Sequence, residues 1–360
     1  MKKLFALLLA LAMVLSFAAC GTSKPTAASS APSATPAEET SEKSTQGLKI
    51  AFFVSDYSNT FHQAQFEAAK KYAADKYGAE VTVFDGQGDA SHQTELIDQI
   101  LAQGMDMATM HVWEDSAANA AIKECLDAGV VMDSFFGPFK GTGIPAVRND
   151  EAGVSKQMGV EMATAWKKAH PDKPIVMVEL GWPDNNEVIT GRTKPFVEGV
   201  LSVCPDAKDL GCLDAGAGAD AAKSLMAGVL NSTPEVNMIY AEASNLCTGV
   251  MSALNDAGRG TLNDDGTPKT ELVCSCDFDD AQYKEIYGNS SLVASLGLSP
   301  AETGCARIDN LMDIYLGKVK QVSDTEEEIL APAYCVSKYS MAKADAAAWL
   351  DKHYGIKVDK

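Results

Sequence analysis

The sequence predicts an α/β protein made of two parallel sheets with helices on both faces. Short apolar runs rich in β-branched and aromatic residues alternate with longer segments of helical periodicity along the chain. The alternation starts at Lys49 and restarts after residues 147–151, so it forms two similar series. The body from Gly47 to Lys360 is long enough for two lobes of about 150 residues each.

The first unit of the series shows this pattern most clearly. Residues 50–54 are an apolar run that suits a strand buried on both faces of a parallel sheet. Apolar side chains then recur at helical spacing from Phe61 to Ala73. The polar loop 56–62 between them is a candidate ligand site, because free N–H groups and the helix dipole point to that end of a strand. An ordinary connection between strand and helix is the alternative.

The other elements follow from the same periodicities. In the first series we expect strands at 80–84, 105–111 and 130–135 and helices at 92–103 and 117–128. In the second we expect helices at 153–168, 192–203, 220–231 and 245–257 and strands at 174–180, 236–241 and 272–276. The chain then crosses back near Leu298 into a helix at 302–316, and a last helix at 340–352 packs on one lobe. No GxGxxG or Walker-type motif supports a phosphate-binding loop.

The N-terminus has the features of an export signal. Two lysines precede the apolar segment 4–15, which is too short to span a bilayer as a helix. Ala18-Ala19-Cys20 resembles a bacterial lipobox, so we expect a signal peptide at 1–19 and lipidation of Cys20; a plain secreted protein is the alternative. Residues 20–46 favour a disordered tether, because they contain almost no large apolar side chain. The expected location is extracytoplasmic, lipid-anchored to the bacterial membrane.

The net charge limits the expected binding partners, and the cysteine spacing limits the expected metal sites and disulfides. The formal net charge is −19 at pH 7, which disfavours nucleic acid and anionic lipid headgroups. The chain has nine cysteines, Cys20 included, and none of their spacings fits a zinc site. Cys204 and Cys212 flank a polar loop and are the best candidates for a disulfide. Most of the others are expected to be buried thiols that pack as small hydrophobic side chains.

The sequence contains no evident catalytic constellation. The five histidines are scattered, and neither HExxH nor GxSxG occurs. The acid pairs Glu114-Asp115 and Asp279-Asp280 could suit glycosidase chemistry, but solvated loop residues explain them as well. We therefore expect no enzyme activity, no cofactor and no metal ion. His111, at the end of a strand, is the one histidine named as a site candidate.

Five segments in a fixed order resemble a known family. They are KIAFFVSDYSNTFH, AGVVMDSFF, the Asn149-Asp150 step, GRTKPFVEGV and CDFDD. Together they resemble the type I periplasmic-binding-protein family, specifically the ribose/galactose-like sugar-binding proteins of ABC transporters. The resemblance implies two Rossmann-like lobes joined by three hinge crossings, with a small polar ligand in the cleft between them and closure by a hinge motion. The lobes would be 47–148 plus about 299–329, and 149–298 plus about 330–360.

The resemblance also implies ligand contacts. Asn59 and Phe61 match the family's first-loop asparagine and stacking aromatic residue, and Arg192 and Asp277 match its second-lobe arginine and aspartate. An aromatic ring can pack on the apolar face of a sugar, an amide donates and accepts, and Arg with Asp can bridge neighbouring hydroxyls. The alternatives are a surface arginine at a helix start for Arg192, and a turn or capping residue for Asp277.

Other positions depart from the family pattern. Phe136-Gly137 stands where pentose and hexose binders have Asp-Arg, and Leu298 stands near the place of an expected glutamine. The second-lobe asparagine is replaced around residues 242–245, and two tryptophans fall on loops that face the site. We therefore expect a pocket that is more aromatic and contacts fewer hydroxyls than a ribose-binding site. The further candidate ligand residues are His111, Trp113, Phe136, Trp182, Glu242 and Asn245.

These features predict a monomeric solute-binding lipoprotein of an ABC importer. It would bind a sugar or sugar-like molecule by hinge closure and deliver it to an ABC permease, touching the membrane only through its lipid anchor. The alternative is a sensory binding protein that presents the same ligand to a membrane receptor kinase or chemoreceptor. Neighbouring genes would separate the two, because an importer needs a permease and an ATPase.

Overall fold

The computed structural model describes residues 43–359 except 112–114, 217 and 326. The predicted signal peptide, Cys20, most of the tether, Trp113 and Glu114 lie outside the described residues. Within the described part of the chain, no helix has both the length and the apolar character needed to cross a bilayer.

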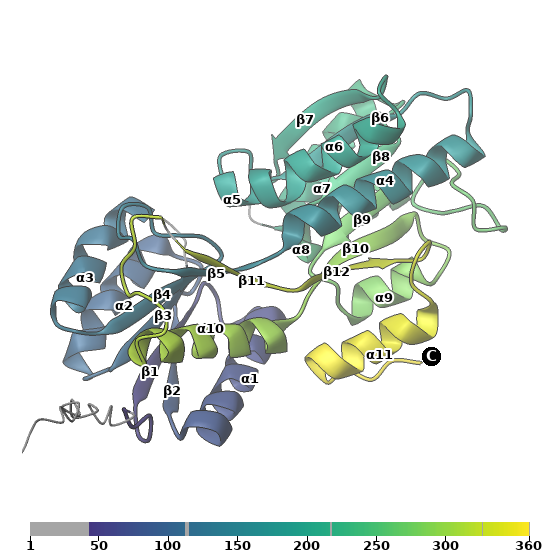
Figure 1. The fold of residues 1–360 in the computed structure, drawn as a ribbon. Coiled ribbons are helices and arrows are strands. Elements are labelled where there is room, and N and C mark those ends of the chain that lie inside the picture. The colour runs from purple at the N-terminus through teal and green to yellow at the C-terminus, as the bar shows by residue number, and fades with distance from the viewer. Residues whose placement is uncertain (1–42, 112–114, 217, 326, 360) are drawn as a thin grey trace, which may run out of the picture. The chain divides into compact units, whose positions relative to one another are not determined.

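The first lobe is built on a sheet of six parallel strands in the order β11-β5-β4-β3-β1-β2 (Figure 1). The strands are β1 Lys49–Val54, β2 Glu80–Asp85, β3 Met107–His111, β4 Val131–Phe135, β5 Ala146–Asn149 and β11 Glu328–Ala331. The helices are α1 Thr60–Tyr77, α2 Ala90–Ala102, α3 Asp115–Asp127 and α10 Pro300–Tyr315. Along β1, Ile50 and Phe52 pack against α1 and α10, whereas Ala51 and Phe53 pack against α2 and α3. This explains the unbroken apolar run, because both faces of the strand are covered.

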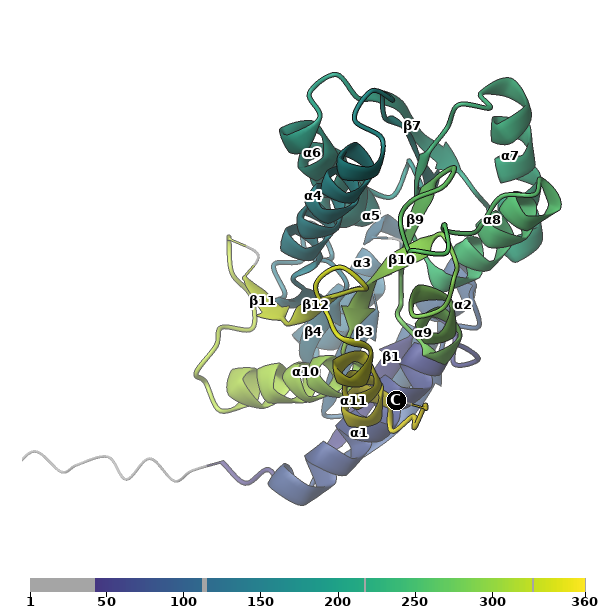
Figure 2. The ribbon, with the colours of Figure 1, turned by 90° about the vertical axis from the view of Figure 1, so that its right-hand side faces the viewer.

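The second lobe has a six-stranded sheet in the order β12-β10-β9-β8-β6-β7, and only the β10–β12 pair is antiparallel (Figure 1). Figure 2 shows the same lobe turned by 90°. The strands are β6 Val176–Gly181, β7 Lys208–Asp214, β8 Met238–Ala241, β9 Leu272–Cys276, β10 Leu292–Leu298 and β12 Ala333–Ser337. The helices are α4 Glu151–Ala169, α5 Asn186–Val188, α6 Lys194–Val203, α7 Ala219–Ser232, α8 Ser244–Asp256, α9 Asp280–Ile286 and α11 Lys343–Tyr354, with a π-helix at Ile189–Thr193. Helices α4 and α6 cover one face of this sheet, and α7 and α8 cover the other.

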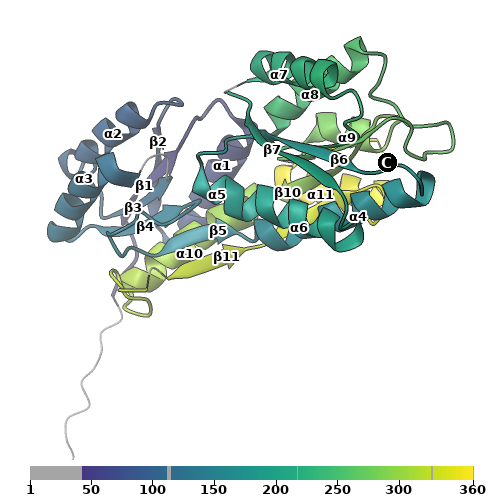
Figure 3. The same cartoon turned by 90° about the horizontal axis from the view of Figure 1, so that it is seen from above.

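The chain passes between the two sheets three times. It crosses from β5 to α4, from β10 to α10, and from β11 to β12. Strands β5 and β11 lie side by side at the crossings, paired from Ala146 with Glu328 to Asn149 with Ala331 (Figure 3). The predicted fold class, two α/β lobes with three crossings, is confirmed. The boundaries assigned to the lobes from the sequence remain a prediction.

The predicted disulfide is wrong, because Cys204 and Cys212 are both free thiols. Cys204 is buried in the core on the α4 and α6 side of the sheet. Cys212 lies on β7, with its Sγ 3.8 Å from a carboxylate oxygen of Glu242. The two sulfur atoms therefore sit in different surroundings, although only a short polar loop separates the residues in sequence.

The start of the predicted helix at 192–203 is also wrong. Helical structure begins at Asn186 and continues through the π-helix into α6 without a break. The cause is local: the Asn185 side chain accepts hydrogen bonds from the N–H groups of Glu187 and Val188, at 3.0 and 3.2 Å, and so caps the helix earlier.

Candidate functional site

The first-lobe side of the candidate site is a cluster of aromatic rings. His111 ends β3, Phe136 follows β4, and Phe61 and His62 lie in the first turn of α1. The His111 ring stacks on Phe136 with centroids 5.8 Å apart and contacts the edge of His62 at 5.1 Å. Phe61 contacts His62 edge-on at 5.5 Å. The fold thus gathers Phe61, His111 and Phe136 around His62 at the carboxyl ends of the strands, where ligands bind in open α/β sheets.

This aromatic cluster has no charge at neutral pH. Burial lowers the pKa of His62 to about 4, and the positive charge of Arg307 acts in the same direction. Burial also lowers the pKa of His111, with further contributions from His62 and Arg307. Ser55 Oγ lies 2.9 Å from His62 Nε2, whereas the Nδ1 atoms of both rings are buried without a partner among the described residues. The cluster offers a ligand apolar faces and neutral ring nitrogens.

A buried cation supports the cluster. Arg307 of α10 is fully buried, and its guanidinium lies 3.8 Å from the ring centre of Phe52 and 4.8 Å from that of Phe135. It donates hydrogen bonds to Thr109 Oγ1 at 2.8 Å and to Gln65 Oε1 at 2.9 Å. Burial lowers the pKa of Arg307 to about 9, which leaves it charged at neutral pH. These contacts tie α10, and with it the second crossing, to the strands that present the aromatic rings.

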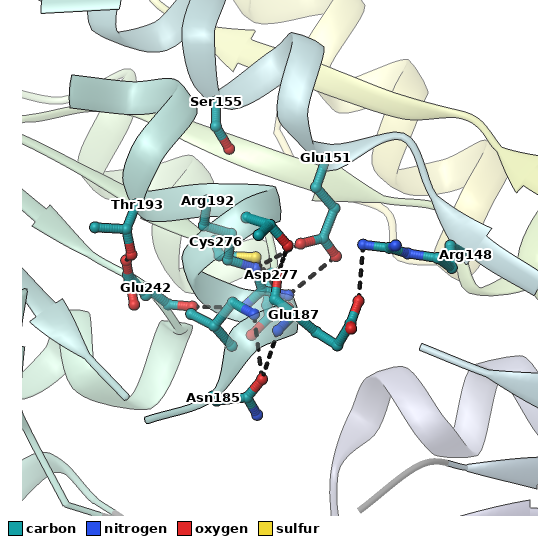
Figure 4. Close-up of polar contacts among 12 residues, drawn as sticks. Arg148, Glu151, Ser155, Asn185, Glu187, Arg192, Thr193, Glu242, Cys276 and Asp277 are labelled. Atoms are coloured by element: carbon teal, nitrogen blue, oxygen red, sulfur yellow. Dashed lines mark hydrogen bonds and ion pairs between the residues drawn. The ribbon is translucent and has the colours of Figure 1, made fainter. Parts of the chain in front are cut away.

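The second-lobe side is dominated by an arginine and a glutamate (Figure 4). Arg192 belongs to the π-helix, and Glu151 is the first residue of α4. Arg192 Nε donates to Glu151 Oε2 at 2.7 Å and Nη2 donates to Oε1 at 3.1 Å, a bidentate pair with both side chains 7% exposed. Arg192 Nη1 donates to the carbonyl of Glu242 at 2.6 Å. Arg192 is therefore not a surface residue at a helix start, and its guanidinium is held in one orientation.

Glu242 lies beside this pair, directly after β8. Its side chain is fully buried, accepts a hydrogen bond from the Thr193 hydroxyl and lies near the Cys212 thiol. Burial raises the pKa of Glu242, and the Thr193 bond and the charge of Arg192 act against that shift. The residue thus holds the end of β8 to the π-helix segment that positions Arg192.

Asp277 and Phe136 share an unusual backbone conformation. Each directly follows a strand, β9 and β4 respectively, and each has a positive φ, 60° for Asp277 and 81° for Phe136. Non-glycine residues in this region are strained, and such strain is concentrated at functional sites. The Asp277 carboxylate accepts a hydrogen bond from the thiol of Cys276, with Sγ 3.4 Å from Oδ1. The capping residue of α9 is Asp279, so the capping alternative does not apply to Asp277.

The two sides of the site meet at the first crossing. Arg148 of β5 forms ion pairs with Glu187 of α5 and with Glu328 of β11, each at 2.9 Å. A small pocket here is lined by Phe136, Arg148, Asn149, Glu151 and Glu187, which come from both lobes. The contact between the lobes is close, because a Cβ at Gly137 would lie 2.9 Å from the carboxyl carbon of Glu187.

The remaining predicted residues occupy other positions. The side-chain oxygens of Asn59 and Asn245 accept hydrogen bonds from the N–H groups of Phe61 and Leu246, both at 2.8 Å. Each side chain therefore binds a backbone N–H group in the first turn of a helix. Trp182 is partly buried and packs on the α7 and α8 side of the second core. Trp113 lies outside the described residues. The ligand-binding roles of all ten candidates remain predictions.

Several residues of the site were missed by sequence reasoning. They are Arg148, Glu151, Glu187 and Arg307, whereas His62 was expected only as part of the candidate loop 56–62. His62 follows Phe61 in the candidate loop, and Glu151 follows the Asn149-Asp150 step, so both stand next to residues that had been singled out. Arg307 gave no such signal, because one arginine on a helix of mixed polarity is typical of an exposed face. Among the described residues, no group of three or more His, Cys, Asp or Glu side chains could hold a metal ion.

Comparison with known proteins decides the family. Residues 50–318 match the model of the periplasmic binding protein domain. The chain belongs to this family. It is 25% identical over 224 residues to the D-ribose/D-allose-binding protein of Pseudomonas aeruginosa, covering 59% of this chain and 67% of that protein. It is 26% identical over 223 residues to the ribose import binding protein of Bacillus subtilis, with the same coverage.

Solved structures show the same fold. A galactofuranose-binding protein superimposes with a TM-score of 0.68 and 21% identity, covering 86% of this chain and 99% of that one. A Mycobacterium smegmatis protein in complex with β-D-fucofuranose gives a TM-score of 0.66 at 18% identity, covering 86% and 96%. The family consists of substrate-binding proteins, so this chain is a binding protein and not an enzyme.

Proposed function

We propose that this protein is the extracytoplasmic solute-binding component of an ABC importer and that its ligand is a sugar or sugar-like molecule held between the two lobes. The names of its relatives support the ligand class, since they include a ribose/allose-binding and a ribose import binding protein. Structural neighbours are named for galactofuranose, fucofuranose and myo-inositol, which all present several hydroxyl groups.

The observation that supports this proposal most is the contrast between the two sides of the site. The first lobe contributes neutral rings, with Phe136 stacked on His111, and the second contributes the polar groups of Arg192 and Asp277. A carbohydrate suits such a site, because one face of its ring is apolar and its edge carries hydroxyls that donate and accept. Neither lobe alone supplies both kinds of contact.

The lipid anchor is part of the proposal. Cys20 would be lipidated after removal of residues 1–19, and the segment to residue 46 would hold the lobes near the membrane and the permease. The protein would act as a monomer that needs no cofactor. The support lies in the sequence alone: a charged start, a short apolar segment and Ala18-Ala19-Cys20.

A thermal-shift screen tests the proposed function. Purified full-length protein is heated with aldopentoses, aldohexoses and cyclitols, with amino acids as the comparison class. A ligand at about 100 times its dissociation constant adds roughly 2.7 kcal/mol to the free energy of unfolding, so a true ligand should raise the melting temperature by several degrees. Stabilisation by amino acids and by none of the polyhydroxyl compounds would contradict the proposal.

A further inference from the structure

The guanidinium of Arg192 already has an anionic partner inside the protein. Glu151 occupies it through Nε and Nη2, and the carbonyl of Glu242 occupies Nη1. A bidentate Arg–carboxylate contact has the geometry with which an arginine would bind the carboxylate or phosphate of a ligand. Glu151 therefore stands where the acidic group of an anionic ligand would bind.

The local fold fixes this arrangement. Lys194 N–H donates to the carbonyl of Ile189, the i to i+5 bond that defines a π-turn. Glu187 lies just before this wider turn and Arg192 lies within it, and they contact two residues of the first crossing, Arg148 and Glu151 respectively. Two crossed ion pairs thus join one short segment of the second lobe to the hinge. Turning Arg192 toward another anion would strand Glu151, which is itself buried.

The charged groups around the site also disfavour an anionic ligand. Arg192 is paired with Glu151, and Arg148 is paired with both Glu187 and Glu328. Arg307 is fully buried, and its guanidinium lies against the rings of Phe52 and Phe135. Asp277 adds a carboxylate that accepts a hydrogen bond from the Cys276 thiol. The histidines of the first lobe bring no positive charge, because burial lowers the pKa of His62 and of His111. An incoming anion would meet an excess of carboxylates.

We propose that Glu151 is a specificity-determining residue: by neutralising Arg192 it restricts the site to neutral polyhydroxyl ligands and rejects sugar acids and sugar phosphates. This inference rests on the proposed function. Asp277 is the carboxylate left to accept hydroxyl hydrogen bonds. A ligand carboxylate would have to displace Glu151 and leave it buried without a partner, so the acid form of a sugar should bind at least about 100-fold more weakly than the neutral form.

The experiment compares each neutral sugar with its acid. Calorimetry of the full-length protein uses D-galactose with D-galacturonate, D-glucose with D-glucuronate, and D-ribose with D-ribonate. The wild type should bind the neutral member of at least one pair and disfavour its acid by at least about 100-fold. Glu151→Gln keeps the shape but removes the charge, so it should strengthen binding of the acid by at least about tenfold. Glu198→Gln is the matched control, since Glu198 pairs with Lys156 on the exposed surface.

The possible results separate a failure of this inference from a failure of the proposed function. A wild type that binds the acid within tenfold of the neutral sugar contradicts the inference and leaves the proposed function intact. The same holds if Glu151→Gln binds both members as the wild type does. Absence of binding by every sugar, neutral or acidic, contradicts the proposed function itself. If Glu151→Gln does not fold, as judged by circular dichroism, the selectivity of the wild type still decides the inference.

Discussion

Gly181, the last residue of β6, lies directly against the carboxylate of Glu242. A Cβ built on Gly181 would lie 1.6 Å from Oε2 of Glu242, far inside any real contact distance. The φ of Gly181 is not positive, so this glycine is required by space and not by backbone conformation. It leaves room for the buried carboxylate that holds β8 against Thr193, next to Arg192.

We predict that Gly181→Ala destabilises the protein and weakens ligand binding. The new methyl group must push Glu242 away, and overpacking of this kind typically costs about 1–3 kcal/mol. Chemical denaturation measures the loss. Gly228→Ala in α7 is the control, because a Cβ there meets nothing within 4 Å and alanine favours the helix by up to about 1 kcal/mol. Equal effects of the two substitutions would show that the Glu242 contact is not as tight as the structure has it.

The stability of the protein should fall in mild acid because of His62. Its pKa is about 4 in the folded protein, below the ordinary value of 6.5, so the unfolded chain binds a proton first. Stability is therefore complete above pH 6.5 and is lost as the pH falls toward 4, by up to about 3 kcal/mol from this residue. His111 contributes in the same direction.

Denaturation curves between pH 4 and 7 check this prediction. His62→Gln cannot take up the proton, so its free energy of unfolding should vary less steeply with pH than that of the wild type. His92→Asn, at a partly exposed position on α2, is the control and should keep the wild-type slope. An unchanged slope in His62→Gln would mean that this histidine is not the source of the acid sensitivity.

Cys20→Ser should release the protein from the membrane. Serine cannot form the thioether that anchors a lipoprotein, so the substituted protein would carry no lipid at residue 20. Fractionation of cells expressing each form, with an antibody to the body of the protein, measures the distribution. A substituted protein that stays in the membrane fraction would rule out lipidation at Cys20 as the means of attachment.

Ligand should reduce the radius of gyration of the protein. Three crossings join the lobes, and hinge closure around a ligand is the motion that such connections allow. Small-angle X-ray scattering with and without a saturating ligand, found in the thermal-shift screen, measures the change. An identical radius, with binding verified by calorimetry on the same sample, would argue against closure.

Much of the fold was readable from the sequence, because parallel strands buried on both faces leave long apolar runs such as 50–54. Arg192 was predicted as a site residue, yet its partner Glu151 was not. The two are 41 positions apart, and their contact depends on a π-turn that periodicity does not reveal. The mistaken pairing of Cys204 with Cys212 has a similar cause, since closeness in sequence does not say where each thiol packs: Cys204 lies in the core on the α4 and α6 side, and Cys212 lies beside the Glu242 carboxylate.

The central claim is that both lobes hold the ligand, and calorimetry on variants from each side tests it most directly. Against the best ligand from the screen, Arg192→Ala and Asp277→Ala should each weaken binding by roughly 30-fold or more, since each removes a hydrogen bond between a charged side chain and the ligand, and such a bond contributes about 1.5–3 kcal/mol. Phe61→Ala should weaken the binding free energy by about 1–3 kcal/mol, because it removes an aromatic ring on which the ligand can stack. Asp280→Ala, at an exposed acid paired with Lys284, should bind as the wild type does. Near-native affinity in Phe61→Ala, or in both second-lobe variants, would contradict a site shared between the lobes.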